Sequence, residues 1–248
     1  MTDENKDNYL KSIDKNKNVF SDYYLKSFTK TEQQKFLELL LEPYKNLENL
    51  LIADVACGAG SLSFHLNNFF KSAQFYCSDY SETAIENLSH KLTGNNFKIS
   101  RETIYELNSY PNNYFDFTFC WMTLSWLEDA EKALNQLIRI TKPSGRVFLS
   151  SLFNLDHDVD LYTKIIDKSS SVGEQTIHAN YYTYSGKTIN EWIKDKVSSY
   201  KFHKFSPSID FTFDGRGIGT YTITLEGGDR IQLSAGMLMN WAVLEIKK

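Results

Sequence analysis

Short apolar runs alternate with amphipathic segments along the first 153 residues. A strand of a parallel sheet that is covered on both faces has no polar side, so it reads as a continuous apolar run. Such runs occupy 50–56, 73–79, 96–100, 114–121 and 146–153. The segments between and before them have apolar residues three or four apart, which predicts helices at 22–44, 61–70, 81–92 and 128–141. This order predicts a parallel sheet built from right-handed crossovers.

The pattern changes after residue 153. Helical spacing predicts helices at 161–171 and 188–197, on either side of an irregular tyrosine-rich stretch, 173–186. Period-two alternation at 211–213, 219–225 and 230–234, with a glycine-rich turn at 226–229, predicts an antiparallel hairpin. A last strand is expected at 241–246.

Composition narrows the class of protein. The 248 residues are 42% hydrophobic, enough for one domain with a proper core, and the net charge of −4 argues against a dedicated nucleic-acid binder. Three cysteines without a CxxC pair predict a reduced, cytoplasmic protein without disulfides or a metal site. No run approaches the roughly 20 apolar residues of a membrane span, and the polar stretch 1–18 has no signal-peptide core.

The most informative stretch is the turn that follows the first strand. Asp54 ends the apolar run, and a series of small residues including Gly58 and Gly60 leads directly into a helix. Glycines allow backbone to approach a ligand closely, and the helix N-terminus offers free N–H groups to an anionic group. A lone GxG is equally typical of a tight turn without a ligand.

Asp79 favours a nucleoside ligand. It ends the next strand, about 20 residues on, where a carboxylate can accept both hydroxyls of a ribose. Ser81 and Glu82 open the following helix, so Asp79 also suits a helix cap, and the two roles are compatible. A dinucleotide site would have a third glycine at position 63, where this chain has Ser63.

At this point the sequence resembles the class I, Rossmann-like S-adenosylmethionine (SAM)-dependent methyltransferases. The family's first motif is matched by Asp54, Ala56, Gly58 and Gly60, and its ribose ligand by Asp79. Further matches follow in the family's order: the fourth strand with Asp116, the loop 123–129, and the turn 142–146 before the fifth strand. Ala56 and Ser144 replace commoner glycines. The resemblance covers roughly residues 22–152.

The resemblance implies a fold and a cofactor site. We expect a mostly parallel seven-stranded α/β sheet with helices on both faces and a C-terminal antiparallel hairpin. SAM is the implied cofactor and S-adenosylhomocysteine (SAH) its product, with no metal. The implied cofactor residues are Asp54, Ala56, Cys57, Gly58, Gly60, Asp79, Tyr80, Thr103, Ile104 and Cys120. In this reading Thr103 and Ile104 flank the adenine, and Cys120 either offers its carbonyl to the cofactor ammonium or is simply a buried apolar residue.

The acceptor pocket of this family forms over the carboxyl ends of the strands. The aromatic candidates to line it are Tyr23, Tyr24, Trp121, Met122, Tyr181, Tyr182 and Tyr184, whereas Trp126 and Trp241 are read as core residues. Arg216, in a glycine-rich loop, is the candidate for a substrate carboxylate or phosphate, or else a solvated hairpin residue. An activated methyl group requires mainly placement of the acceptor; a base matters for a hydroxyl or a protonated amine. His157 and His178 are the candidate catalytic bases, and each also suits a surface loop.

We therefore expect a cytoplasmic methyltransferase that modifies an oxygen or nitrogen atom of a small molecule. It would act as a monomer or homodimer, with neither nucleic acid nor membrane as a partner. The alternatives are an RNA or protein methyltransferase and a catalytically silent SAM-binding protein; a nicotinamide dehydrogenase fits poorly. A flexible polar arm is expected at 1–18, followed by a single domain, 19–248. The domain divides into a helical lid (19–48), a cofactor-binding core (49–153), a substrate-side elaboration (154–240) and a last strand (241–248).

Overall fold

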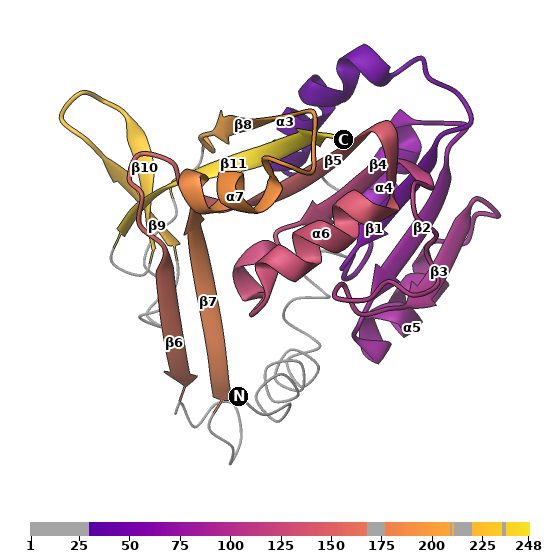
Figure 1. Ribbon diagram of the computed structural model, residues 1–248, viewed down its shortest axis with the longest axis horizontal. Coiled ribbons are helices and arrows are strands. Elements are labelled where there is room, and N and C mark those ends of the chain that lie inside the picture. Colours follow the sequence, from indigo (N-terminus) through magenta and orange to yellow (C-terminus); the bar gives the residue numbers. More distant parts are fainter. Residues whose placement is uncertain (1–29, 168–176, 209, 211–219, 235–236) are drawn as a thin grey trace.

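The computed structural model describes residues 30–167, 177–208, 210, 220–234 and 237–248. Five parallel strands form the centre of its sheet in the order β3-β2-β1-β4-β5, and all have their carboxyl ends at one edge (Figure 1). They are β1 (Leu51–Val55), β2 (Gln74–Asp79), β3 (Phe97–Arg101), β4 (Phe115–Trp121) and β5 (Thr141–Asn154). The chain reverses strand order between β1 and β4, where open α/β sheets bind their ligands.

Antiparallel strands complete the sheet beyond β5. β11 (Met237–Lys247) lies between β5 and β8 (Ser199–Phe205) and is antiparallel to both. The described strands form an eleven-stranded sheet, more than the seven strands expected, and β3-β2-β1-β4-β5-β11-β8 is one continuous run within it. A hairpin of β9 (Thr220–Thr224) and β10 (Arg230–Ser234) pairs with the first part of β11 and confirms the antiparallel elaboration.

Helices cover both faces of the sheet. α3 (Glu32–Leu41), the 3-10 helix η1 (Glu42–Tyr44), α4 (Ser61–Phe69) and α5 (Glu82–Lys91) lie on the first face. Their apolar residues form one core with phenylalanines of the sheet, including Phe75, Phe119 and Phe148. The second face carries α6 (Ala130–Ile140), α7 (Gly186–Ile193) and the short 3-10 helix η2 (Leu124–Trp126), with Leu134, Leu137 and Phe153 in their core. No helix in the described ranges is long and apolar enough to span a bilayer.

The prediction of a helix at 161–171 was wrong. Residues 161–167 form strand β6 (Leu161–Asp167), antiparallel to β7 (Ile177–Ser185), which takes up most of the stretch expected to be irregular. The end of β7 adds in parallel to the end of β5, and this hairpin extends past the central strands (Figure 1). Tyrosine, threonine and isoleucine favour strands once a sheet edge is available to pair with, which a helical count of apolar residues does not reveal.

Smaller differences concern boundaries. The helix predicted at 188–197 is α7, which begins two residues earlier and ends at Ile193. β11 begins at Met237, before the predicted start of the last strand, and the turn at 142–146 is contained in β5 next to a β-bulge. The polar arm 1–18, the predicted strand 211–213 and the first part of the predicted helix 22–44 lie outside the described residues.

Candidate functional site

Three residues in left-handed backbone conformation shape the turn between β1 and α4. They are Ala56 (φ 57°), Gly58 (φ 53°) and Gly60 (φ 77°). A Cβ on Gly58 would meet no atom within 4 Å, so the surface above it is open. A Cβ on Gly60 would lie 2.2 Å from Leu88 Cδ1, so Gly60 is required for close packing of the turn against α5. The two glycines therefore serve different purposes, and Gly58 is the one that faces open space.

Asp79 ties this turn to the end of β2. Its Oδ2 accepts a hydrogen bond from Gly58 N–H at 2.9 Å, and its Oδ1 accepts one from Ser81 N–H at 2.9 Å. Cys57 N–H donates to Ser78 O at 3.0 Å, which adds a second link between the turn and β2. The two loops that were singled out from the sequence are therefore one hydrogen-bonded unit at the carboxyl edge of the sheet.

Asp54 lies beneath the turn and is fully buried. Ser63 Oγ donates to its Oδ2 at 2.6 Å, while Oδ1 has no hydrogen-bond partner among the described residues. Burial, with a smaller contribution from the charge of Asp79, raises the pKa of Asp54 from 3.8 to about 7, against the opposing effect of the Ser63 hydrogen bond. A carboxyl group poised near neutrality lies directly under the candidate site.

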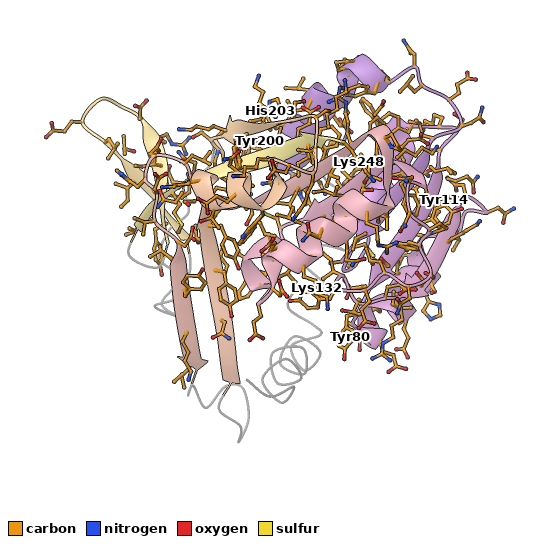
Figure 2. All side chains as sticks on the ribbon, viewed as in Figure 1. Tyr80, Tyr114, Lys132, Tyr200, His203 and Lys248 are labelled. Carbon is orange, nitrogen blue, oxygen red and sulfur yellow. The ribbon has the colours of Figure 1, made fainter. Side chains whose placement is uncertain are left out.

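The residues expected around an adenine lie on one side of this unit. Tyr80 is 44% exposed, with the Arg101 guanidinium 5.4 Å from its ring centre, and it lies at the same edge of the molecule as Lys132 (Figure 2). Thr103 is half-buried and Ile104 is buried in the loop after β3. Figure 2 places Lys248 nearer the opposite edge, where its Nζ donates to the carbonyl oxygen of Thr141 at 2.8 Å.

Cys120 is fully buried in β4, and burial raises the pKa of its thiol to about 12. The pKa of Cys57 is also raised by burial. Both thiols therefore stay protonated at neutral pH, which argues against a nucleophilic role, since the thiolate is the reactive form. The predicted use of the Cys120 carbonyl stays a prediction.

A network of neutral polar groups lies beyond the end of β4. Met122 has a positive φ of 57°, and its Sδ accepts hydrogen bonds from Trp241 Nε1 (3.2 Å) and Ser150 Oγ (3.3 Å). Ser150 Oγ in turn accepts from Gln33 Nε2 at 2.5 Å. Strained backbone of this kind clusters at functional sites. The sequence did not indicate Gln33 and Ser150 as site residues, because they are 117 residues apart and no local pattern predicts a contact over that separation.

A second polar group lies next to it, on the other face of β5. Ser125 Oγ and Ser151 Oγ are 2.8 Å apart and buried, and the rings of Trp126 and Tyr181 meet edge to face at 4.8 Å. Burial raises the pKa of Tyr181, and a hydrogen bond with Ser125 opposes this rise. The consecutive residues Ser150 and Ser151 of β5 thus contribute to two different polar clusters. Trp126 is 38% exposed, so the prediction that it is a core residue was wrong.

Tyr182 and Tyr184 are separated from Tyr181. Both are buried in the core of the α6 face, and Tyr184 OH donates to Leu127 O at 3.3 Å. Side chains alternate along a strand, so neighbouring tyrosines of β7 point to opposite faces of the hairpin. Only Tyr181 of the three joins the polar clusters above the sheet.

Comparison with known proteins finds a methyltransferase domain in part of the chain. A family profile described as a methyltransferase domain matches residues 53–149, from inside β1 to inside β5. This match supports the resemblance to the class I SAM-dependent methyltransferases over residues 53–149. The fold of the chain is similar to that of the DhpI–SAH complex, with a TM-score of 0.59 at 13% identity over 96% of this chain and 92% of that one.

Two curated relatives carry different names. The chain is 30% identical over 130 residues to the tRNA U34 carboxymethyltransferase of Campylobacter curvus, covering 51% of this chain and 43% of that protein. It is 30% identical over 106 residues to the mitochondrial arginine-hydroxylase NDUFAF5 of Homo sapiens, covering 43% of this chain and 29% of that protein. The chain therefore spans less than half the length of either relative.

The remaining candidate residues occupy other places. His157 is exposed in the loop after β5, where its backbone N–H donates to Asn154 Oδ1 at 3.2 Å. The backbone of His178 pairs with Ile166 in the β6–β7 hairpin, but its side chain is not among those described. Tyr23, Tyr24 and Arg216 lie outside the described residues. Within the described ranges, no group of three or more His, Cys, Asp and Glu side chains is placed to hold a metal ion.

Proposed function

We propose that this protein is a SAM-dependent methyltransferase that transfers a methyl group to an oxygen or nitrogen atom of a small-molecule acceptor. The observation that carries the proposal is the hydrogen bond between Gly58 N–H and the Asp79 carboxylate, which joins an open glycine turn to the ribose-binding position of the family. Gly58 follows β1, which borders β4 at the switch in strand order, and Asp79 ends β2 on the other side of β1. We propose the cytoplasm as its location and a monomer or homodimer as its state.

The residues present fit the cofactor. Gly58 leaves open space where a ligand can approach the backbone, and the adjacent buried Asp54 has a carboxylate oxygen without a partner in the described chain, which suits a cationic group. In the proposal, Ala56, Cys57, Gly58 and Gly60 face the amino-acid end, Asp79 holds the ribose, Tyr80, Thr103 and Ile104 surround the adenine, and Cys120 lies near the ammonium. When bound, SAM supplies an activated sulfonium methyl group.

The protein's own task is then to place the acceptor. Alignment of a nucleophile behind the methyl group removes several kcal/mol of the barrier, because a bimolecular encounter becomes an oriented one. The side chains proposed for this task are neutral: the carboxamide of Gln33, the hydroxyl of Ser150, and the Met122 thioether and Trp241 indole that contact each other. Tyr181 and Trp126 add an aromatic wall. Such a lining favours an uncharged polar group on a planar or apolar body.

A nucleic-acid acceptor is the second candidate, because one relative is named for a tRNA modification. Against it stands the net charge of −4, since RNA binding draws most of its affinity from basic side chains. Titration with bulk tRNA separates the two proposals: saturable binding at physiological salt would replace the small-molecule acceptor by RNA. Cofactor binding without methylation of any acceptor would favour the silent SAM-binding protein.

The decisive experiment is a calorimetric titration of the protein with SAH, with NAD as the control ligand. We expect micromolar binding of SAH and none of NAD. Asp79→Asn should weaken SAH binding at least 10-fold, since a carboxylate that accepts from hydroxyl groups makes charge-assisted hydrogen bonds. Asp116→Asn is the matched control. Asp116 also accepts a backbone N–H, that of Leu51 at 2.8 Å, but it lies at the amino end of β4. Equal loss in both variants, or no SAH binding by the folded wild type, would refute the proposal.

A further inference from the structure

Helix α3 directs two consecutive glutamines into the protein. Gln33 and Gln34 are both buried, although a helix that packs on a sheet normally presents apolar side chains there. A buried carboxamide is costly unless its hydrogen bonds are made, so the partners of each glutamine indicate what it does. The two side chains have different partners, 27 and 117 residues away along the chain.

Gln34 links the start of α3 to the start of α4. Its Oε1 accepts the backbone N–H of Thr31 at 2.9 Å and completes a capping box with the Thr31 hydroxyl. Its Nε2 donates to Ser61 Oγ at 3.0 Å. Ser61 is the first residue of α4 and follows Gly60, an N-cap residue in left-handed conformation that makes no side-chain cap. The Gln34 carboxamide therefore caps the N-terminus of α3 and also contacts the first residue of α4.

The first turn of α4 is where small displacements would matter. Free N–H groups at a helix N-terminus favour an anionic ligand group only if they stay aimed at it. Gly60 contributes no side chain to hold this turn, and glycine has more backbone freedom than any other residue. The Gln34–Ser61 hydrogen bond supplies such a restraint from outside the Rossmann-like core.

We propose that Gln34 is a positioning residue of the cofactor site: it holds Ser61 and the first turn of α4, and so couples the order of α3 to cofactor binding. This inference rests on the proposed function. Coupling of this kind is reciprocal, so if an ordered α3 strengthens SAH binding, bound SAH stabilises α3 by the same factor. Gln33 provides the contrast, because it holds the same helix to Ser150 of β5 and not to the cofactor turn.

The test combines calorimetry with hydrogen exchange of α3 in four variants of the full chain. Gln34→Leu removes both roles of the carboxamide, and Ser61→Ala removes the contact with α4 but keeps the capping box. Thr31→Ala weakens the cap of α3 alone, and Gln33→Leu removes the neighbouring buried carboxamide. We expect Gln34→Leu and Ser61→Ala to weaken SAH binding 5- to 20-fold, and the two controls to stay within about 2-fold. SAH should slow amide exchange across α3 in the wild type and in both controls, but not in Gln34→Leu or Ser61→Ala.

Each possible outcome of this test either supports or overturns the inference. Equal losses in Gln34→Leu and Thr31→Ala would show that only the stability of α3 matters, which overturns the inference. Unchanged SAH affinity in Ser61→Ala overturns it as well, and this variant keeps the test valid if Gln34→Leu fails to fold. A wild type that does not bind SAH refutes the proposed function itself, whereas a wild type that binds SAH without any effect on α3 exchange refutes only the coupling.

Discussion

Replacement of Asp54 by asparagine tests the electrostatics beneath the glycine turn between β1 and α4. Asp54 is fully buried, with one oxygen bonded to Ser63 and the other without a partner in the described chain. Burial raises its pKa from 3.8 to about 7. Between these two pKa values, the Asp54 carboxyl group is protonated in the folded protein and ionised in the unfolded chain. The folded protein therefore loses stability relative to the unfolded chain as the pH rises through this range.

The sign and size follow from proton linkage. Between pH 4 and pH 7 the folded state binds more protons than the unfolded state at this group, so the free energy of unfolding falls as pH rises. At about 1.4 kcal/mol for each pKa unit, the full contribution of Asp54 is about 4 kcal/mol, of which about 3 kcal/mol is lost between pH 5 and pH 8. Asparagine resembles the protonated acid and does not titrate. Its amide group lacks a partner, which costs about 1–3 kcal/mol at every pH.

Urea unfolding of both proteins at pH 5, 6, 7 and 8, followed by tryptophan fluorescence, measures the difference directly. We expect Asp54→Asn to be less stable than the wild type at pH 5 and to equal or exceed it at pH 8. Ser63→Ala should steepen the wild-type dependence, since the hydrogen bond from Ser63 lowers the pKa of Asp54. A difference between wild type and Asp54→Asn that stays constant from pH 5 to pH 8 would refute the reasoning.

Four further variants test packing, loop order and binding. Gly60→Ala should cost about 2–5 kcal/mol in thermal unfolding, because overlap of its Cβ with Leu88 adds to the backbone strain of a positive φ. Gly58→Ala has only the backbone strain, about 1–2 kcal/mol, and should reduce SAH affinity more than stability. Equal thermal losses in both variants would contradict this. Arg139→Met should speed proteolysis of the β3–β4 loop, since the Arg139 guanidinium donates to three of its carbonyl oxygens; unchanged cleavage would exclude this role. Gln33→Leu should raise KM for the acceptor and leave SAH affinity within about 2-fold, and a changed SAH affinity alone would argue against a place on the acceptor side.

The parallel core was predictable because each of its strands is a local apolar run and each of its helices has a local period. The glycine turn and Asp79 were found in the same way, from short motifs about 20 residues apart. The β6–β7 hairpin was not predictable by these means. Its tyrosines and threonines become a strand only where the end of β5 offers a partner, and its alternation then directs Tyr181 toward Ser125 while Tyr184 enters the core.

The polar network beyond the end of β4 was even less predictable from the sequence. No local sequence pattern indicates that the residues of this network, which are Gln33, Met122, Ser150 and Trp241, come into contact. They meet because β11 returns to pair with β5 and α3 lies across the same face of the sheet. Polar residues of this kind carry no periodic signal, since their burial is compensated by partners that are distant along the chain.

By itself, the sequence determined the α/β class, the central strands and helices and the glycine turn, because local periodicity and motif spacing encode them. Only the tertiary structure decided that Gly60 is needed for packing and Gly58 for open space. It alone also showed that Asp54 is a buried carboxyl group whose pKa is raised to about 7, and that Gln33 and Gln34 of α3 contact β5 and α4 respectively. The physical reason is that burial, proton affinity and side-chain partnership depend on atoms that folding brings together from distant parts of the chain.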